Sequence, residues 1–96
     1  MSYPAALKKY KELCINRPDL LKAMTDAIGQ HVKALNAVRS DQAGSKILPR
    51  HQEFADFCGA KSAQVFGIAM REHLKGQGWA KTPVREKGKR YNYYNR

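Results

Sequence analysis

Basic side chains at two places in the C-terminal half of the chain have the chemistry to bind a polyanion. Arginine and lysine pair with phosphate oxygens, and glutamine or arginine can also form two hydrogen bonds with the edge of adenine or guanine. The candidate contacts on an expected helix are Lys61, Ser62, Gln64, Ile68, Arg71 and Lys75. Those on an expected β-hairpin are Lys81, Arg85, Lys87, Lys89 and Arg90.

The helical set is assigned to the outward face because it lies opposite the apolar residues of the same segment. On that face Gln64 would read adenine and Arg71 would read guanine. Lys61 and Ser62 stand at the start of the helix, where free N–H groups and the helix dipole favour a phosphate. The basic residues of the hairpin would contact phosphates or the minor groove. A helix face that is merely solvated is the alternative that the sequence leaves open.

The charge of the chain predicts a polyanionic partner. Its 96 residues include 18 Lys and Arg but only 8 Asp and Glu, a formal net charge of +10. Eight basic residues and two acidic ones lie between Arg71 and Arg96, so more than half of the net charge belongs to this end. We expect double-stranded DNA as the partner, although RNA and anionic membranes attract such a charge too. Because no apolar run reaches about 18 residues, we expect no membrane span. Nucleic acid is the expected partner, and no membrane partner is expected.

The sequence contains no pattern typical of an enzyme or a metal site. It lacks a glycine-rich phosphate loop, the nucleophile motif G-x-S-x-G and a pair of carboxylates at catalytic spacing. His31 and His73 lie on or beside apolar stripes, which is typical of partly buried histidine. Cys14 and Cys58 are expected to be buried free thiols, since no metal-binding Cys or His pair accompanies them. We therefore expect no catalysis, no metal and no cofactor.

Apolar periodicity predicts two helices in residues 1–39. The first runs from Pro4 to Ile15. The second begins at Pro18 and carries an apolar stripe as far as Val38, which makes it the strongest periodic signal in the chain. Proline suits the first turn of a helix, because the N–H that it lacks has no partner there.

The middle of the chain joins these helices to a second pair. Polar residues 39–45 predict a loop, and the triplet Lys46–Leu48 predicts a very short strand before a proline. The second pair of helices occupies residues 49–75. A tight turn at Gly59–Lys61 separates them, and Gly76 stops the second helix. This spacing is typical of a helix-turn-helix, whose second helix can lie in the major groove of DNA.

Residues 79–95 predict a β-hairpin. A glycine between two lysines can take the positive φ of a tight turn, and Pro83 places the first strand at an edge. Alternation puts Tyr91 and Tyr93 on one face and Tyr94 on the other. Two alternatives remain open: a disordered basic tail, and a platform of tyrosines that stack on single-stranded bases. Tyrosines that simply cover a small core are the plainer interpretation.

About half of the chain resembles small winged helix-turn-helix DNA-binding domains. The resemblance covers residues 51–94, HQEFADFCGAKSAQVFGIAMREHLKGQGWAKTPVREKGKRYNYY. The shared pattern is an apolar helix ending in Gly, a helix ending in L-x-x-x-G-W/F, and a basic strand, glycine turn and second strand ending in aromatics. Similar domains are attached to primase and helicase proteins of phages and mobile elements.

The length of 96 residues predicts a single domain over residues 1–96, and the predicted elements make it mainly α with a small C-terminal β-hairpin (α+β). The resemblance implies a winged helix-turn-helix with an extra N-terminal helix. The N-terminal helices would occupy residues 1–39, the helix-turn-helix 49–75 and the basic wing hairpin 79–95.

The expected function is that of a small DNA-binding protein, either a transcriptional regulator or an accessory replication factor encoded by a phage or plasmid. Two other classes stay open: a phage-type inhibitor that binds a host nucleic-acid-handling complex, and an RNA-binding module. A second copy of the chain or a host protein could bind the charged N-terminal helices. The first residues, MSYPAALKKYKEL, lack the apolar core of a secretory signal. We therefore expect a cytoplasmic protein, nucleoid-associated when bound to DNA.

Overall fold

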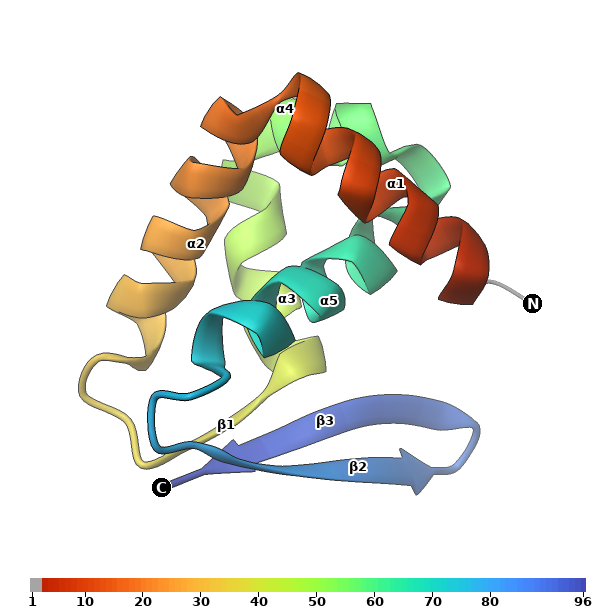
Figure 1. The fold of residues 1–96 in the computed structure, drawn as a ribbon. Coiled ribbons are helices and arrows are strands. Elements are labelled where there is room, and N and C mark those ends of the chain that lie inside the picture. The colour runs from red at the N-terminus through yellow and green to blue at the C-terminus, as the bar shows by residue number, and fades with distance from the viewer. Residues whose placement is uncertain (1–2) are drawn as a thin grey trace.

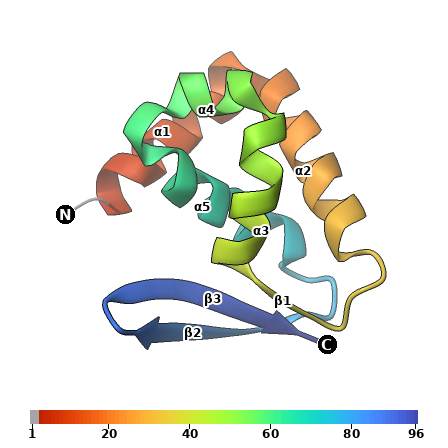
Figure 2. The same ribbon diagram turned by 180° about the vertical axis from the view of Figure 1, so that it is seen from behind.

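The computed structural model describes residues 3–96, in which a body of helices stands on a three-stranded antiparallel sheet (Figure 1). Seen from behind, the hairpin β2–β3 runs along one side of this body (Figure 2). The helices are α1 (Tyr3–Asn16), α2 (Pro18–Val32), α3 (Ser40–Ile47), α4 (Gln52–Cys58) and α5 (Ser62–Leu74). The strands are β1 (Ala37–Arg39), β2 (Ala80–Glu86) and β3 (Lys89–Asn95). The predicted fold class, mainly α within α+β, is confirmed.

Local sequence signals set the start of α2. The helix begins at Pro18, as predicted, and Asp19 adds a carboxylate where the helix dipole favours one. The guanidinium of Arg17 pairs with Asp19 at 2.9 Å and with Glu53 of α4 at 3.4 Å. The start of α2 is therefore held against α4.

The predicted boundaries between residues 33 and 48 are wrong. α2 ends at Val32 instead of Val38. The chain turns there and places Val38 in β1, where it is buried opposite Tyr94 of β3. Residues 40–47, which were expected to form a loop and the start of a short strand, form α3. The strand that joins the hairpin in the sheet is therefore β1, before α3, and the short strand predicted at Lys46–Leu48 does not form.

Tertiary packing makes α3 a helix in spite of its polar, loop-like sequence. Ala43, Gly44 and Ile47 recur at helical spacing and are all buried. Gly44 permits a close approach to α5, because a Cβ atom there would lie 3.2 Å from the ring of Phe66. Contacts of this kind outweigh the weak helix propensity of serine, aspartate and glycine.

The helix predicted from Pro49 to residue 58 is interrupted. Leu48–Arg50 forms a single 3-10 turn, and α4 begins only at Gln52 because the backbone of His51 leaves the helical region (φ −132°, ψ 63°). Gly59 ends α4 with a φ of 60°, a conformation that favours glycine. A second 3-10 turn, Gly59–Lys61, then leads into α5.

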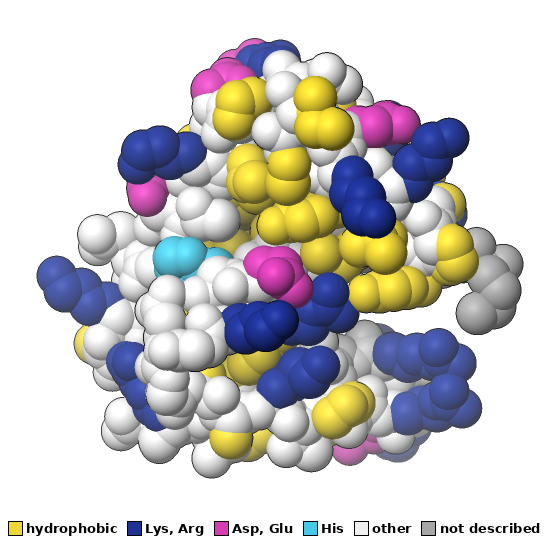
Figure 3. Space-filling view, viewed as in Figure 1, with side chains coloured by type: hydrophobic (Ala, Val, Ile, Leu, Met, Phe, Trp, Pro, Cys, Tyr) yellow, Lys and Arg dark blue, Asp and Glu magenta, His cyan; other side chains and the backbone are white. Residues whose placement is uncertain are grey.

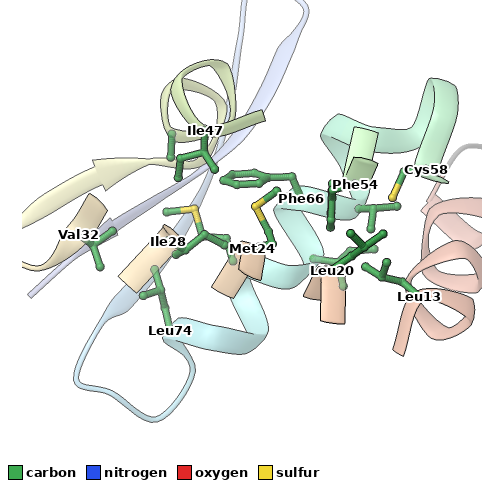
Figure 4. Packing of buried hydrophobic residues seen from close by; sticks show 14 of the residues in the cluster. Leu13, Leu20, Met24, Ile28, Val32, Ile47, Phe54, Cys58, Phe66 and Leu74 are labelled. Atoms are coloured by element: carbon green, nitrogen blue, oxygen red, sulfur yellow. The ribbon is translucent and has the colours of Figure 1, made fainter. Parts of the chain in front are cut away.

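α5 is the centre of the hydrophobic core. It packs against α1, α2, α3 and α4. Figure 4 shows Phe66 of α5 pointing toward Met24 of α2 and Ile47 of α3. Phe66 and Met24 are fully buried, and Leu74 continues the buried side of α5 to its end. Because α5 is held on several sides, the position of its C-terminal end, from which the chain continues into β2, is set by the core.

The predicted hairpin is confirmed. β2 pairs with β3 from Ala80 opposite Asn95 to Glu86 opposite Lys89, so two residues, Lys87 and Gly88, make the turn. Both have positive φ, 48° and 80°, as in the type I′ turns that suit the twist of a hairpin. β1 pairs with the other side of β3, which leaves β2 as an edge strand.

Pro83 is accommodated because of its position on this edge. It stands opposite Asn92, whose backbone N–H donates to the hydroxyl of Ser40 at 3.0 Å on the side of β1. In an antiparallel ladder the N–H and C=O of a residue point to the same side. The nitrogen of Pro83 therefore faces away from β3, where no donor is needed.

Arg96 and Trp79 fasten the open end of the hairpin to the body. The guanidinium of Arg96 donates hydrogen bonds to the carbonyls of Val32, Lys33 and Leu35, each at 3.2 Å. It also lies 4.2 Å from the centre of the Trp79 ring. A cation over the last carbonyls of a helix is favoured by the helix dipole. This arginine therefore caps α2 and holds the base of the hairpin at the same time.

Candidate nucleic-acid interface

A groove of about 630 Å³ runs between α5 and the hairpin. Side chains of α5, of both hairpin strands, of the start of α3 and of Tyr3 in α1 line it. Five of the predicted contacts lie along it: Gln64, Ile68, Arg71, Arg85 and Arg90. In the view of Figure 1, dark-blue basic side chains gather at the lower right, over the tip of the hairpin (Figure 3).

α5 exposes a narrower face than the sequence predicts. Ile68 was assigned to the outward face, but it is buried with 4% of its surface exposed, because helices pack around α5 on several sides. Gln64 is exposed, as is Ala63 before it. Gly67 and Arg71, next to Gln64 on the helix surface, are half-buried. One row of side chains therefore faces the groove.

Arg71 is held in place by its neighbours. Its Nη1 donates to the hydroxyl of Tyr3 at 2.9 Å, and its Nη2 lies 3.3 Å from the carboxylate of Glu72. The bond to Tyr3 raises the pKa of Arg71 above its ordinary value, so the side chain stays charged. A guanidinium has five N–H donors, which leaves donors for a ligand in the groove.

The other predicted contacts lie outside the groove. Lys61 and Ser62 are half-buried at the start of α5, and Lys75 is exposed just beyond its end. Lys81, Lys87 and Lys89 are exposed on the hairpin. The structure thus brings the arginines together in the groove and spreads the lysines around it.

The basic residues of the hairpin have no acidic partner within residues 3–96. The ion pairs of this part of the chain use six of the eight acidic residues, and all six belong to the helical body: Glu12, Asp19, Asp26, Asp41, Glu53 and Glu72. None of these pairs involves a hairpin residue. The ion pairs of the described residues therefore leave the five hairpin cations available to an external anion.

A cluster at the start of α3 neutralises the acid that lines the groove. Arg39 donates to both oxygens of Asp41, at 3.0 and 2.6 Å, and its guanidinium lies 3.8 Å from the centre of the Tyr91 ring. The hydrogen bond from Arg39 lowers the pKa of Asp41. Arg39, Asp41 and Tyr3 were not predicted as part of this site, because they lie in other elements and no local sequence pattern marks them.

The three tyrosines of β3 do not form a continuous stacking platform. Tyr94 is buried in the core, where burial raises its pKa. Arg39 covers one face of the Tyr91 ring, and Tyr93 is 37% exposed. The predicted alternation is confirmed in that Tyr94 points toward the helical body.

The two cysteines differ, contrary to expectation. Cys58 is buried, which raises the pKa of its thiol to about 11, whereas Cys14 is exposed.

The histidine on the apolar side of α2 is half-buried, as predicted. Burial and the charge of Lys46 lower the pKa of this residue, His31. Between residues 3 and 96, no three His, Cys, Asp or Glu side chains gather where they could hold a metal ion. No helix in that part of the chain is both long and apolar enough to span a membrane.

Comparison with known proteins identifies no family for this chain. No protein-family model matches it, and no match was found among curated proteins or solved structures. What the structure supports is a helical domain followed by an antiparallel β-hairpin, an arrangement compatible with a winged helix.

Proposed function

We propose that this chain is a DNA-binding protein of winged-helix type, in which the hairpin acts as the wing and holds the phosphate backbone. Its role would be that of a transcriptional regulator or an accessory replication factor. One observation carries the proposal: the hairpin presents five exposed cations, and within residues 3–96 none of them is paired with an acid. The cations are Lys81, Arg85, Lys87, Lys89 and Arg90.

The order of the elements supports the same assignment. β1 comes directly before α3, the hairpin follows α5, and the strands lie in the order β1-β3-β2. This arrangement places a basic hairpin beside a helix, as a wing requires. Because α5 is enclosed, we assign most of the contacts with DNA to the wing. Lys61 and Ser62 at the start of α5 would add further phosphate contacts.

Binding through phosphates predicts a strong dependence on salt. Each neutralised phosphate adds about 0.9 to the negative slope of log K against log salt concentration. If four hairpin cations contact the backbone, we expect a slope of about −3 to −4. Fluorescence anisotropy of a labelled duplex between about 50 and 200 mM salt measures this slope.

The double variant Lys87→Ala/Lys89→Ala tests the wing directly. We expect weaker binding to every sequence and a slope shallower by about two units, because two phosphate contacts are lost. The matched control is Lys8→Ala/Lys11→Ala, which removes the same charge from exposed positions on α1. Equal effects of the two variants would show that only net charge matters and would contradict the proposal. No binding by the wild type at low salt would direct the search to a protein partner instead.

A further inference from the structure

α5 is too enclosed to enter the major groove of a duplex. A helix has a diameter of about 10–12 Å and the major groove is about 12 Å wide, so an inserted helix must be free over most of one side. Four helices pack against α5, and Ile68 and Met70 beside the residues that line the groove are only 4% and 0% exposed. α5 therefore cannot be inserted into a duplex, whereas a single strand is narrow enough to lie in the groove along Gln64, Gly67 and Arg71.

Gly67 lies at the bottom of the groove, and no packing contact of the fold requires a glycine at this position. It lies in the interior of α5 with an ordinary helical φ, where glycine is less stable than alanine. Among residues 3–96, and apart from the neighbouring backbone of α5 itself, no atom lies within 4 Å of the position that a Cβ on Gly67 would take, whereas a Cβ on Gly44 would lie 3.2 Å from the ring of Phe66. Packing therefore does not require a glycine at this position, and a larger side chain would project into the groove.

The walls of the groove have the charge and the rings that a nucleic-acid strand needs. Arg71, Arg85 and Arg90 line it, and Arg39 neutralises the single acid among the lining residues, Asp41. Tyr3 lines the groove beside Arg71 and is 47% exposed, so one face of a base can stack on its ring. Phosphates would pair with the arginines while bases lie over the glycine.

We propose that this groove seats one unpaired strand of DNA, while the wing holds the backbone next to it. The preferred ligand is then a duplex with a single-stranded tail. This inference rests on the proposed function and adds to it the class of DNA that the chain prefers.

Filling the groove tests the inference. Gly67→Trp places a large side chain over the floor at a position where the fold has room, and Ala23→Trp, on the exposed side of α2, is the matched control. Anisotropy at about 50 mM salt would compare three labelled probes: a single strand of about 15 nucleotides, a blunt duplex, and the same duplex with a single-stranded tail. Circular dichroism would check folding, and Gly67→Leu would replace the tryptophan variant if that variant did not fold.

We expect wild type and Ala23→Trp to bind the tailed duplex about tenfold more tightly than the blunt one, and Gly67→Trp to lose this preference. The inference is overturned if wild type has no preference for a tail, or if Gly67→Trp retains it or loses affinity equally for all three probes. The proposed function survives these results as long as Lys87→Ala/Lys89→Ala weakens binding more than Lys8→Ala/Lys11→Ala does. It fails together with the inference only if wild type binds none of the probes.

Discussion

The helical body and the hairpin use charged residues in opposite ways. In the body, six acidic side chains pair with basic neighbours, and the apolar side chains are buried. In the hairpin, β2 and β3 bury one residue between them, Tyr94, and no ion pair in residues 3–96 uses their cations. The difference shows that most acids of the body are used in local ion pairs, whereas the cations of the hairpin are left available to a ligand.

The largest expected effect is a difference in how much the free energy of unfolding falls when a residue of the body or of the hairpin is replaced. Phe66→Ala should lower the free energy of unfolding by about 3–5 kcal/mol, because it leaves a cavity at the centre of the core. Tyr93→Ala, on the exposed side of the hairpin, should cost less than about 1 kcal/mol. Urea unfolding measures both. Similar losses for the two variants would contradict the division between a packed body and an exposed hairpin.

A smaller effect should appear where the two regions are joined. Arg96→Ala removes three hydrogen bonds to the end of α2 and the contact with Trp79, so we expect a loss of about 1–2 kcal/mol. Arg50→Ala, at an exposed position without an ion pair in the described residues, should change stability by less than about 0.5 kcal/mol. If thermal unfolding gave the same result for both, the C-terminal arginine would not anchor the hairpin.

Replacing one glycine in each region by alanine should change stability in opposite directions. Gly88→Ala should destabilise by about 1 kcal/mol, because the turn needs a φ of 80°. Gly67→Ala should stabilise by up to about 1 kcal/mol, since it lies inside a helix with free space around it. The change in melting temperature of each variant measures this. A destabilising Gly67→Ala would mean that packing requires the glycine after all.

The smallest expected effect is a change in stability at low pH that depends on the ion pair between Arg39 and Asp41. The pKa of Asp41 is lowered from 3.8 by Arg39, so its contribution to stability is present above that value and is lost as pH falls toward the pKa of the folded state. Asp41→Asn lacks the ionised carboxylate, and we expect its deficit relative to wild type to shrink as pH falls from about 5 to about 2. Asp26→Asn, in an exposed pair with Lys22, is the control. A deficit that did not change with pH would exclude this contribution.

Strong local signals in the sequence predicted most of the fold. The apolar stripe of α1, the proline at the start of α2, the glycine after α4 and the glycine of the hairpin turn were all interpreted correctly. The errors fall between residues 33 and 51, mainly where β1 and α3 form. β1 has only three residues and α3 is polar, so neither has a pattern long enough to detect, and both depend on partners distant in sequence.

The candidate site was predicted in part. Composition identified the basic hairpin, and helical spacing identified Gln64 and Arg71, both of which line the groove. The same spacing placed Ile68 outside, because a helical wheel does not reveal how many neighbours surround a helix. Tyr3 and Asp41 join the groove from elements that are distant in the chain, and no sequence pattern marks them.

The sequence by itself determined where charge accumulates, which segments turn, and that a helical body precedes a hairpin. These properties depend on residue type and on neighbours a few positions away. Only the tertiary structure decided that α5 is enclosed, that a narrow part of its surface faces a groove, and that six of the seven acids of the body are paired with bases. Those properties depend on contacts between distant segments, whose geometry is set by packing of the whole core.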